Sequence, residues 1–454
     1  MNASSPSWFR RYYAPLLLVI IAFSFVTRVW QLHVPNSYMF DEVYHALTAK
    51  LMARNDNRAF EWWNPPVEEH TAVDWLHPPL AKYTQALGIR FFGENSFGWR
   101  ISSAVFGTLV IFLTARLALV ATADERVSLL AAFLAASDGL LLVQSRIAMN
   151  DIHVTFAILL TLLMYSKFNK ELGRGQNKTD SLLFLFATGV SAGIAIATKW
   201  SGLFALIIVW IFEILSVSAK ISPKLKWRSW FLSRFIFLLA VPVLIYVASY
   251  GQMYLQGKDL VHFKELHKNI FWYQTNLVAE HPYESRPWQW ALNLKPVWYH
   301  VQYQEKVRAD IYAFGNLPLF WIGLVAVGAT SLHLLRQFLH QAQEKKYTLM
   351  GVLRAFRATT LTPTGFLVFS YFAVWLPWQF SPRIMFFYHY APAVPLLAII
   401  LSWWLVLQER YRTLVWLVIG LIAMGFVLWY PHWTGIFMSQ NLKDSLYFFY
   451  SGWK

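Results

Sequence analysis

Two adjacent carboxylates, Asp41 and Glu42, follow the first long apolar segment within the stretch Phe40–His45. At the start of an outer loop they would lie near a membrane surface, where a charged group is costly unless it has a partner or a function. A carboxylate in this setting can act as a general base whose pKa is tuned by its surroundings. The structural alternative is a helix N-terminus, where acidic residues are also favoured.

A second candidate site contains His77 and Lys82, which flank the Pro78–Pro79 step. Proline fixes its own φ and restricts the residue before it, so this step would hold the two side chains in a set relation. Both would then lie at the mouth of the second apolar segment. The alternative is a rigid turn that leads into a helix.

Further ionisable or hydroxyl-bearing residues lie in or beside apolar segments, on what we predict to be one face of a membrane. Basic side chains with carboxylates nearby suit a phosphate-bearing substrate and a base. Any one of them could instead be a snorkelling side chain or part of a structural ion pair. Five sets that converge on one face favour a functional site. They contain Arg100, Asp138, Arg146, Asp151, His153, Lys199, Arg383, Tyr388 and His389.

These residues must be positioned by helices that cross a membrane. Of the 454 residues, 57% are hydrophobic and 14% are charged, against about 25% charged residues in an ordinary soluble domain. This composition excludes a disordered chain, a fibrous repeat and most soluble enzymes. A spanning helix needs roughly 20 apolar residues, and eleven segments qualify. We therefore predict an all-α, multi-pass membrane protein with spans at 14–32, 97–121, 127–144, 153–166, 182–197, 202–218, 235–254, 313–334, 360–377, 385–406 and 414–430.

The net charge of +15 could indicate a nucleic-acid partner, but its distribution favours a membrane topology. With the N-terminus in the cytoplasm, the predicted cytoplasmic segments hold 19 Lys and Arg against 6 Asp and Glu. The outer segments hold 17 against 16. Positive residues are enriched in cytoplasmic loops, so we expect the C-terminus and the candidate site outside, and no nucleic-acid partner.

Two long loops, 33–96 and 255–312, and the tail 431–454 contain most of the residues predicted on the outer face. Within the loops, 45–58 and 260–274 are predicted to be amphipathic helices on the outer membrane surface. No segment outside the spans is long enough to bury a sizeable core of its own. We therefore treat 1–454 as a single membrane domain.

Several familiar motifs are missing from the sequence. The chain has no cysteine, no Walker loop, no dinucleotide fingerprint and no zinc-peptidase motif. No cofactor is therefore required by the sequence. Carboxylates such as Asp41, Glu42 and Asp151 could hold a divalent metal, but no spacing demands one, and we assign no metal ligand.

Taken together, the motifs resemble the polyprenyl-phosphate-mannose–protein mannosyltransferases, the protein O-mannosyltransferase family of GT-C glycosyltransferases. The resemblance rests on an ordered set between residues 38 and 395. In order, the set is FDEV, HPPLAK, GWRISSAVFG, DGLLLVQSRIAMND, TKWSGLF, HPYESRPWQWALNLKPVWYH and SPRIMFFYHYAPAVP. It implies a GT-C fold of about eleven spans and an inverting transfer of mannose from a lipid phosphate to Ser or Thr hydroxyls of secreted proteins.

The resemblance also implies residue roles. Asp41 would be the general base, Glu42 would position the acceptor or Asp41, and Arg100 would hold the donor phosphate. We extend the donor-binding site to matching positions on the outer face. These are His77, Lys82, Arg146, Lys199, Arg383, Tyr388 and His389.

One departure concerns the loop 255–312, which is too short for the β-trefoil-type insertion of eukaryotic members. The chain therefore resembles a bacterial member in a plasma membrane, with a polyprenyl-phosphate sugar and a secreted acceptor as partners. Transfer of another lipid-linked sugar, such as aminoarabinose, onto lipid A or a glycan stays open. A secondary transporter is the alternative from another class, but the sequence shows no internal repeat.

Overall fold

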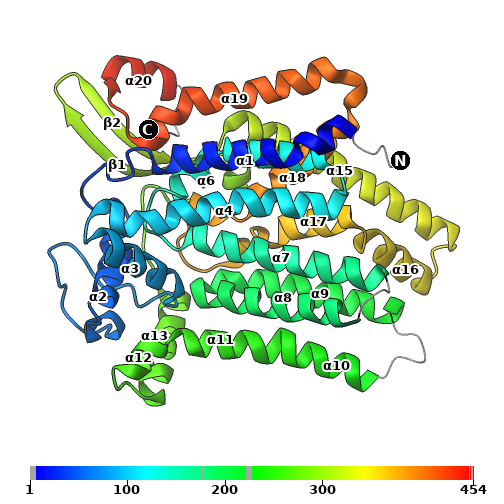
Figure 1. The fold of residues 1–454 in the computed structure, drawn as a ribbon, viewed down its shortest axis with the longest axis horizontal. Coiled ribbons are helices and arrows are strands. Elements are labelled where there is room, and N and C mark those ends of the chain that lie inside the picture. The colour runs from blue at the N-terminus through cyan, green and yellow to red at the C-terminus, as the bar shows by residue number, and fades with distance from the viewer. Residues whose placement is uncertain (1–6, 175–177, 221–226, 449, 451–452, 454) are drawn as a thin grey trace.

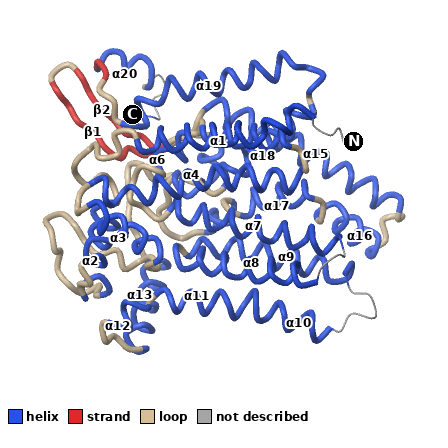
Figure 2. Tube along the Cα trace, in the orientation of Figure 1, coloured by secondary structure: helices blue, strands red, loops and turns tan. Residues whose placement is uncertain are grey.

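The computed structural model describes residues 7–174, 178–220, 227–448, 450 and 453. Long helices lie side by side and run between two ends of the molecule (Figure 1), and helix far exceeds strand (Figure 2). The helices between these two ends are α1 (Ser7–Val29), α4 (Ser96–Thr122), α5 (Glu125–Ala136), α6 (Gly139–Gln144), α7 (Asp151–Arg174), α8 (Lys178–Thr198), α9 (Leu203–Lys220), α10 (Trp227–Phe235), α11 (Val241–Ser249), α15 (Leu317–Glu344), α17 (Pro363–Ala373), α18 (Ala393–Leu407) and α19 (Arg412–Thr434). Helix α16 (Leu349–Thr360) connects α15 to α17 and has a different direction from α17.

Seven helices of the described residues are long and apolar enough to cross a membrane, or eight if one bent pair is a single span. The bent pair joins α16 to the segment Pro363–Phe380 at 86°. Two shorter apolar helices, Trp200–Ser216 and Ala393–Leu407, lie among them. Each of the eleven predicted segments overlaps a helix, so the multi-pass helical architecture is confirmed, although not every segment is one long helix.

Two predicted spans are wrong in extent. The segment 127–144 breaks between α5 and α6, because the Asp138 side chain caps α6 by accepting from the Leu141 amide at 2.8 Å. The same carboxylate accepts from the Asn316 amide at 3.1 Å. In the segment 385–406, helix α18 begins only at Ala393, because Phe387–Tyr390 form the 3₁₀ turn η5.

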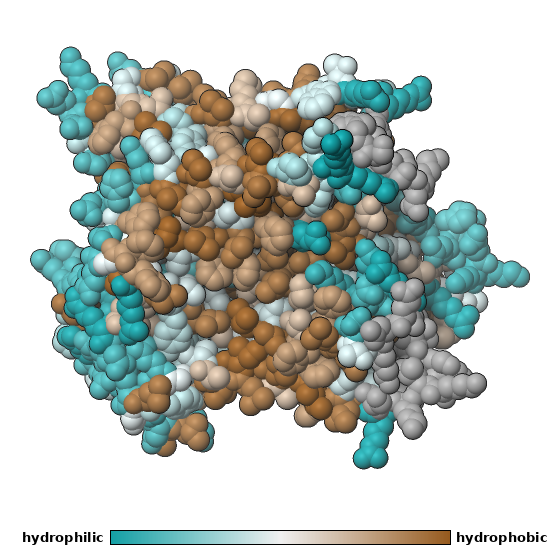
Figure 3. Space-filling model, in the orientation of Figure 1, coloured by the Kyte–Doolittle hydropathy of each residue, from teal (hydrophilic) through white to brown (hydrophobic). Residues whose placement is uncertain are grey.

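On the face shown in Figure 3, apolar side chains form a belt across the middle, and hydrophilic ones gather at both ends. The outward surfaces of α1, α11 and α19 contribute to the belt with Leu18, Leu244 and Val427, which are all well exposed. The inner helices α5, α7 and α18 are in contrast buried on most sides. A belt this apolar fits a lipid environment, in which helices satisfy their own backbone hydrogen bonds.

The loops and short elements between α1 and α4, between α11 and α15, and after α19 gather at one end, which we call the loop end (left in Figure 1). Its helices are α2 (Glu42–Ala53), α3 (Leu80–Phe92), α12 (Gly251–Leu255), α13 (Leu260–Asn276), α14 (Pro287–Ala291) and α20 (Gln440–Tyr447). The helices predicted around 45–58 and 260–274 are thus confirmed as α2 and α13. Helix α1 begins at the opposite end and α19 finishes at the loop end, as an odd number of crossings requires.

A three-stranded antiparallel sheet at the loop end was not predicted. Strands β1 (Val297–Gln304) and β2 (Val307–Ala313) form a hairpin, and β3 (Met438–Ser439) pairs with β2 in the order β1-β2-β3. A register shift between Trp298 and His300 marks a bulge in β1. The remaining short elements are η1 (Asn57–Phe60), η2 (Trp200–Gly202), the π-helical η3 (Ile236–Ala240), η4 (Leu376–Phe380) and η6 (Glu409–Tyr411).

Candidate active site

The two adjacent carboxylates have different environments. Glu42 is fully buried and forms a two-point ion pair with Arg100, at 2.8 Å from Nε to Oε1 and 2.7 Å from Nη2 to Oε2. It also accepts from the backbone amides of Met39 at 3.1 Å and Ala148 at 2.9 Å. Each carboxylate oxygen therefore accepts two hydrogen bonds, and Glu42 fixes the loop before α2 against the turn that follows α6.

Arg100 uses all its donors within the protein. Besides Glu42, its guanidinium donates to the carbonyls of Leu32 at 3.2 Å, Pro35 at 2.8 Å and Ser37 at 2.8 Å. A guanidinium has five N–H groups, and here each has a partner. Arg100 therefore binds the loop that precedes Asp41, and its expected role at the donor phosphate stays a prediction. Glu42 contacts the same loop through the Met39 amide, and its expected role in positioning the acceptor or Asp41 also stays a prediction.

Arg146 has a similar structural role at the end of α1. It donates from Nη1 to the carbonyls of Arg28 at 2.9 Å and Trp30 at 2.7 Å. The last carbonyls of a helix lack partners within the helix. Arg146, in the turn between α6 and α7, supplies the missing donors. Arg146 thus caps α1, and its expected role in donor binding stays a prediction. His153, one turn into α7, is buried and its Nδ1 lies 3.1 Å from the Met149 carbonyl.

Asp74 gathers three basic side chains at the loop end. Its carboxylate lies 2.8 Å from His45 Nδ1, 3.0 Å from His77 Nδ1 and 2.8 Å from Lys82 Nζ. Lys82 also donates to the His77 carbonyl at 3.0 Å. Burial alone would raise the pKa of Asp74, but His77, Lys82 and His45 together hold it well below its usual range. The Pro78–Pro79 step does bring His77 and Lys82 together, as predicted, and the sequence analysis missed the carboxylate that joins them.

The ligand atoms of His45, Asp74 and His77 lie within 4.8 Å of one another, a spacing that a metal ion could bridge. Lys82 contacts the same carboxylate with its ammonium group. The charge that would attract a cation is therefore already neutralised by a buried lysine. These residues fit a charged hydrogen-bond cluster better than a metal site.

Asp41 is the carboxylate that stays available. It occupies the N-cap position of α2, but its side chain makes no capping hydrogen bond. Burial raises the pKa of the Asp41 carboxyl to about 6; Asp151 adds to the rise, and His45 and Lys199 oppose it. A carboxylate whose pKa is near neutral, and which accepts no side-chain hydrogen bond from another described residue, is suited to take a proton from a substrate.

Lys199 brings a positive charge close to Asp41. Its Nζ donates to Asp151 Oδ1 at 2.7 Å and lies 5.5 Å from the centre of the Tyr388 ring. Phe40, which precedes Asp41, stacks on Tyr299 of β1 at 4.5 Å between ring centres and meets Tyr388 edge-on at 6.1 Å. The aromatic rings thus close one side of the space around Asp41.

A cavity of about 230 Å³ opens beside Lys199. Its wall includes His77 from the first loop, Gln274 from α13 and Arg383 from the segment before η5. The Arg383 side chain makes no hydrogen bond or ion pair with another described residue, and it also lines a neighbouring cavity that contains Glu280 and Glu284. His389 packs beneath, with its ring 4.4 Å from Trp378 and its Nδ1 3.0 Å from the Phe386 carbonyl.

The 3₁₀ turn η4, which contains Trp378, also borders an apolar groove of about 650 Å³. Trp378 faces the charged cavity, whereas Leu376, Pro377 and Phe380 face the groove. From there the groove extends along α15, α16 and α17 and is lined almost entirely by apolar side chains. The 86° bend between α16 and α17 leaves this groove open.

Comparison with known proteins identifies the fold and the family. Residues 18–266 match the family described as dolichyl-phosphate-mannose-protein mannosyltransferase, and residues 259–449 match the C-terminal four-transmembrane region of protein-O-mannosyltransferase. The chain belongs to the dolichyl-phosphate-mannose-protein mannosyltransferase family. It is therefore an integral membrane glycosyltransferase, as the ordered motifs predicted.

Relatives of this mannosyltransferase-family chain cover most of its length. The polyprenol-phosphate-mannose–protein mannosyltransferase of Mycolicibacterium smegmatis is 25% identical, over 93% of this chain and 90% of the relative. That of Corynebacterium glutamicum is also 25% identical, over 67% and 69%. The Saccharomyces cerevisiae Pmt1-Pmt2 complex bound to the sugar donor gives a TM-score of 0.79 at 15% identity, over 97% of this chain and 92% of the matched chain. The predicted GT-C fold is confirmed.

Proposed function

We propose that the chain transfers mannose from a polyprenyl-phosphate-mannose donor to Ser or Thr hydroxyls of secreted proteins, at the outer face of a bacterial plasma membrane. The observation that carries this proposal is a carboxylate without a capping hydrogen bond, Asp41, whose charge interacts with Lys199, a lysine that lines one cavity together with Arg383. The mannosyltransferase relatives support the donor and the acceptor class.

In the proposed reaction, Asp41 removes the proton from the acceptor hydroxyl as its oxygen attacks the anomeric carbon. The bond from that carbon to the phosphate oxygen breaks, and the lipid phosphate leaves with the electron pair. One displacement inverts the configuration of the sugar. Phosphate is a good leaving group, so the site needs mainly a base and positive charge at the departing oxygens.

Lys199 and Arg383 are the groups we assign to the donor phosphate. Asp151 holds Lys199 in place at 2.7 Å, and Arg383 lines the cavity without an ion pair to another described residue. An arginine can bind two phosphate oxygens at once. His77, Tyr388 and His389 lie near these charges. Arg100 and Arg146 instead fix the loop before Asp41 and the end of α1 through backbone carbonyls.

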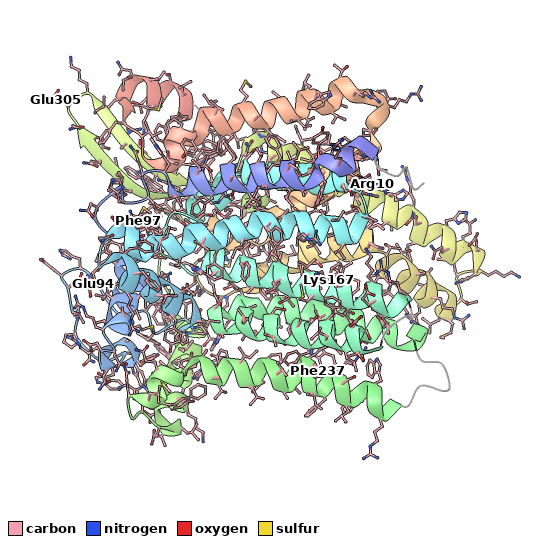
Figure 4. All side chains as sticks on the ribbon, in the orientation of Figure 1. Arg10, Glu94, Phe97, Lys167, Phe237 and Glu305 are labelled. Carbon is pink, nitrogen blue, oxygen red and sulfur yellow. The ribbon has the colours of Figure 1, made fainter. Side chains whose placement is uncertain are left out.

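The apolar groove along α15, α16 and α17 is the place we assign to the polyprenyl chain. It meets the charged cavity at η4, so one donor can place its phosphate at Arg383 and its tail in the groove. Burying isoprenoid surface there gains about 25 cal/mol for each Å² removed from water. The basic residues of the opposite end, such as Arg10 and Lys167 (Figure 4), would face the cytoplasm.

The test is transfer in detergent with purified wild-type protein, polyprenyl-phosphate-mannose and a Ser/Thr peptide, followed by mass spectrometry of the peptide. We expect a single hexose on a hydroxyl. Asp41→Asn should abolish it, while Glu69→Gln, on the same loop but 89% exposed, should not. Product formation by Asp41→Asn at the wild-type rate would contradict the assignment of the base.

A parallel assay with polyprenyl-phosphate-aminoarabinose and lipid A tests the alternative hypothesis that the protein transfers aminoarabinose to lipid A. An arabinosyl transferase of Pseudomonas aeruginosa is 31% identical to this chain, but over only 46% of it. We expect no transfer of aminoarabinose. Transfer of that sugar in place of mannose would overturn the proposed donor.

A further inference from the structure

The hairpin at the loop end has one strand edge without a partner. Strand β2 lies between β1 and β3, so β1 is the outer strand of the sheet. Helix α20 lies on the β3 side, and Glu305 marks the hairpin tip (Figure 4), where its carbonyl accepts from Gln440 Nε2 at 3.3 Å. Among the described residues, no backbone hydrogen bond reaches the outer side of β1 between Val301 and Tyr303.

The register shows which β1 groups point outward. The Gln440 amide donates to the Lys306 carbonyl at 3.1 Å, and Arg308 pairs with Met438, so Lys306 and Arg308 face β3. Backbone groups alternate between the two sides along an antiparallel strand, so Val307 and Ala309 face β1. Their partners Gln304 and Gln302 therefore face β2. The backbone N–H and C=O groups of Val301 and Tyr303, which lie opposite Asp310 and Arg308, therefore point outward.

This edge lacks the features that usually block strand pairing. Exposed edges are commonly protected by charges, by proline or by a bulge. The outer half of β1, Val301–Gln304, contains neither a charged residue nor a proline. The bulge of β1 lies at its other half, between Trp298 and His300. Tyr303 is 60% exposed, so an incoming strand would meet no side-chain cover there.

The edge begins in the wall of the active site. Tyr299 stacks on Phe40 at 4.5 Å, and Phe40 is followed directly by Asp41. A strand rises about 3.3 Å per residue, so the step from Tyr299 to Tyr303 covers roughly 13 Å from this wall toward solvent. A polypeptide paired with β1 would thus have one end close to Asp41.

We propose that the acceptor polypeptide binds as an extended strand along the outer edge of β1, with its Ser or Thr delivered to Asp41 at the inner end. This inference rests on the proposed function, because it names the surface that the protein acceptor uses. Backbone pairing recognises an extended chain with little regard to its side chains. Such a site would accept many sequences, but only segments that are not already folded.

The test is a scan of one acceptor peptide with single backbone N-methyl groups on either side of its Ser or Thr. N-methylation removes one amide donor and places a methyl group against the partner strand. We expect the peptide KM to rise about tenfold or more at every second position on one side, with little change at the positions between. The donor KM should stay constant throughout.

Equal transfer to all methylated peptides, or equal loss at consecutive positions, would overturn β-strand pairing while leaving the mannosyltransferase function intact. If the wild-type protein does not transfer mannose to the unmethylated peptide, the proposed function fails, and this inference fails with it. The two failures are therefore distinguishable in one experiment.

A variant of the enzyme gives an independent measurement. Val301→Pro removes an outward amide that the hairpin itself does not use, and proline is tolerated on the open side of an edge strand. We expect the peptide KM to rise about tenfold, with kcat and the donor KM close to wild type. Glu305→Ala at the tip is the control. An unchanged peptide KM in a folded Val301→Pro protein would overturn the proposal.

Discussion

Asp41 and Glu42 are neighbours in the sequence, but their side chains enter two regions that differ in how fully their polar groups are hydrogen-bonded. In the region of Glu42 and Arg100, every donor and acceptor of the ion pair has a partner. In the region of Asp41, the carboxylate makes no capping bond and Arg383 faces a cavity. The saturated pair can only hold the loop, whereas the unsaturated groups can bind and react. Here the difference between a structural residue and a reactive one is whether its hydrogen bonds are already satisfied within the protein, more than its charge or its burial.

The largest effect that would test this contrast is expected at Asp41. We expect Asp41→Asn to lower kcat by about 10²–10⁴-fold, because a general base contributes that much. Thermal unfolding should stay unchanged or move slightly upward, because burial disfavours the charged form. Steady-state transfer and a thermal melt of the same preparation check both expectations. A clearly lower melting temperature of the Asp41→Asn protein would show that Asp41, like Glu42 and Arg100, stabilises the fold.

The next effect concerns the supporting pair. Arg100→Ala leaves Glu42 buried without its counter-charge, and breaking such a pair costs about 3–5 kcal/mol. The expected result is a lower melting temperature in detergent and less folded protein, with a near-normal donor KM in the fraction that folds. Arg54→Ala, at an exposed pair with Glu94, is the control. If Arg100→Ala stayed stable and only raised the donor KM, Arg100 would be a phosphate ligand after all.

A smaller effect is expected at the cavity. Arg383→Ala should raise the donor KM by about 10–100-fold, since a hydrogen bond to a charged group contributes about 1.5–3 kcal/mol. Stability should not change, because Arg383 makes no ion pair with a described residue. Donor titrations at saturating peptide give the measurement, and Arg383→Lys should recover part of the loss. A drop in melting temperature with an unaltered donor KM would show that Arg383 has a structural role and does not bind the donor phosphate.

The smallest effect is the pH dependence. The base must be ionised to accept a proton, and burial raises the pKa of Asp41 to about 6. We therefore expect kcat/KM to be level above pH 7 and to fall about tenfold for each unit below pH 6. The profile should be measured from pH 4.5 to 8, with the fold monitored at each pH. An apparent pKa near 4 would show that Asp41 is as well solvated as a surface carboxylate.

Much of the fold could be predicted from the sequence, because hydropathy reports directly on which segments can lie in lipid. The helices α1, α4, α7 and α8 follow from long apolar runs. The break at Asp138 could not be read in this way, since its cap depends partly on Asn316, which is distant in the chain. The hairpin was missed because β1 is rich in aromatic residues and is half exposed, so its alternation is weak.

For the site, the sequence indicated which residues gather at one end but not how they are paired. Lys199 lines a cavity with Arg383 and also lies near Asp41 and Tyr388, whereas Arg100 and Arg146 donate to backbone carbonyls. Asp74 and His45 were overlooked, although Asp74 stands three residues before His77. Pairing depends on which donors face which acceptors, and that is decided by tertiary packing.

The bond from the Ala148 amide to Glu42 has a consequence for how the protein is made. The loop with Asp41 is synthesised early, but one of the groups that hold it belongs to the turn after α6, more than a hundred residues later. Arg146, which caps α1, comes from the same turn. Until that turn has left the ribosome and entered the membrane, the first helix end and the catalytic loop lack these contacts. The active site is therefore completed by biosynthesis well after its base has been translated.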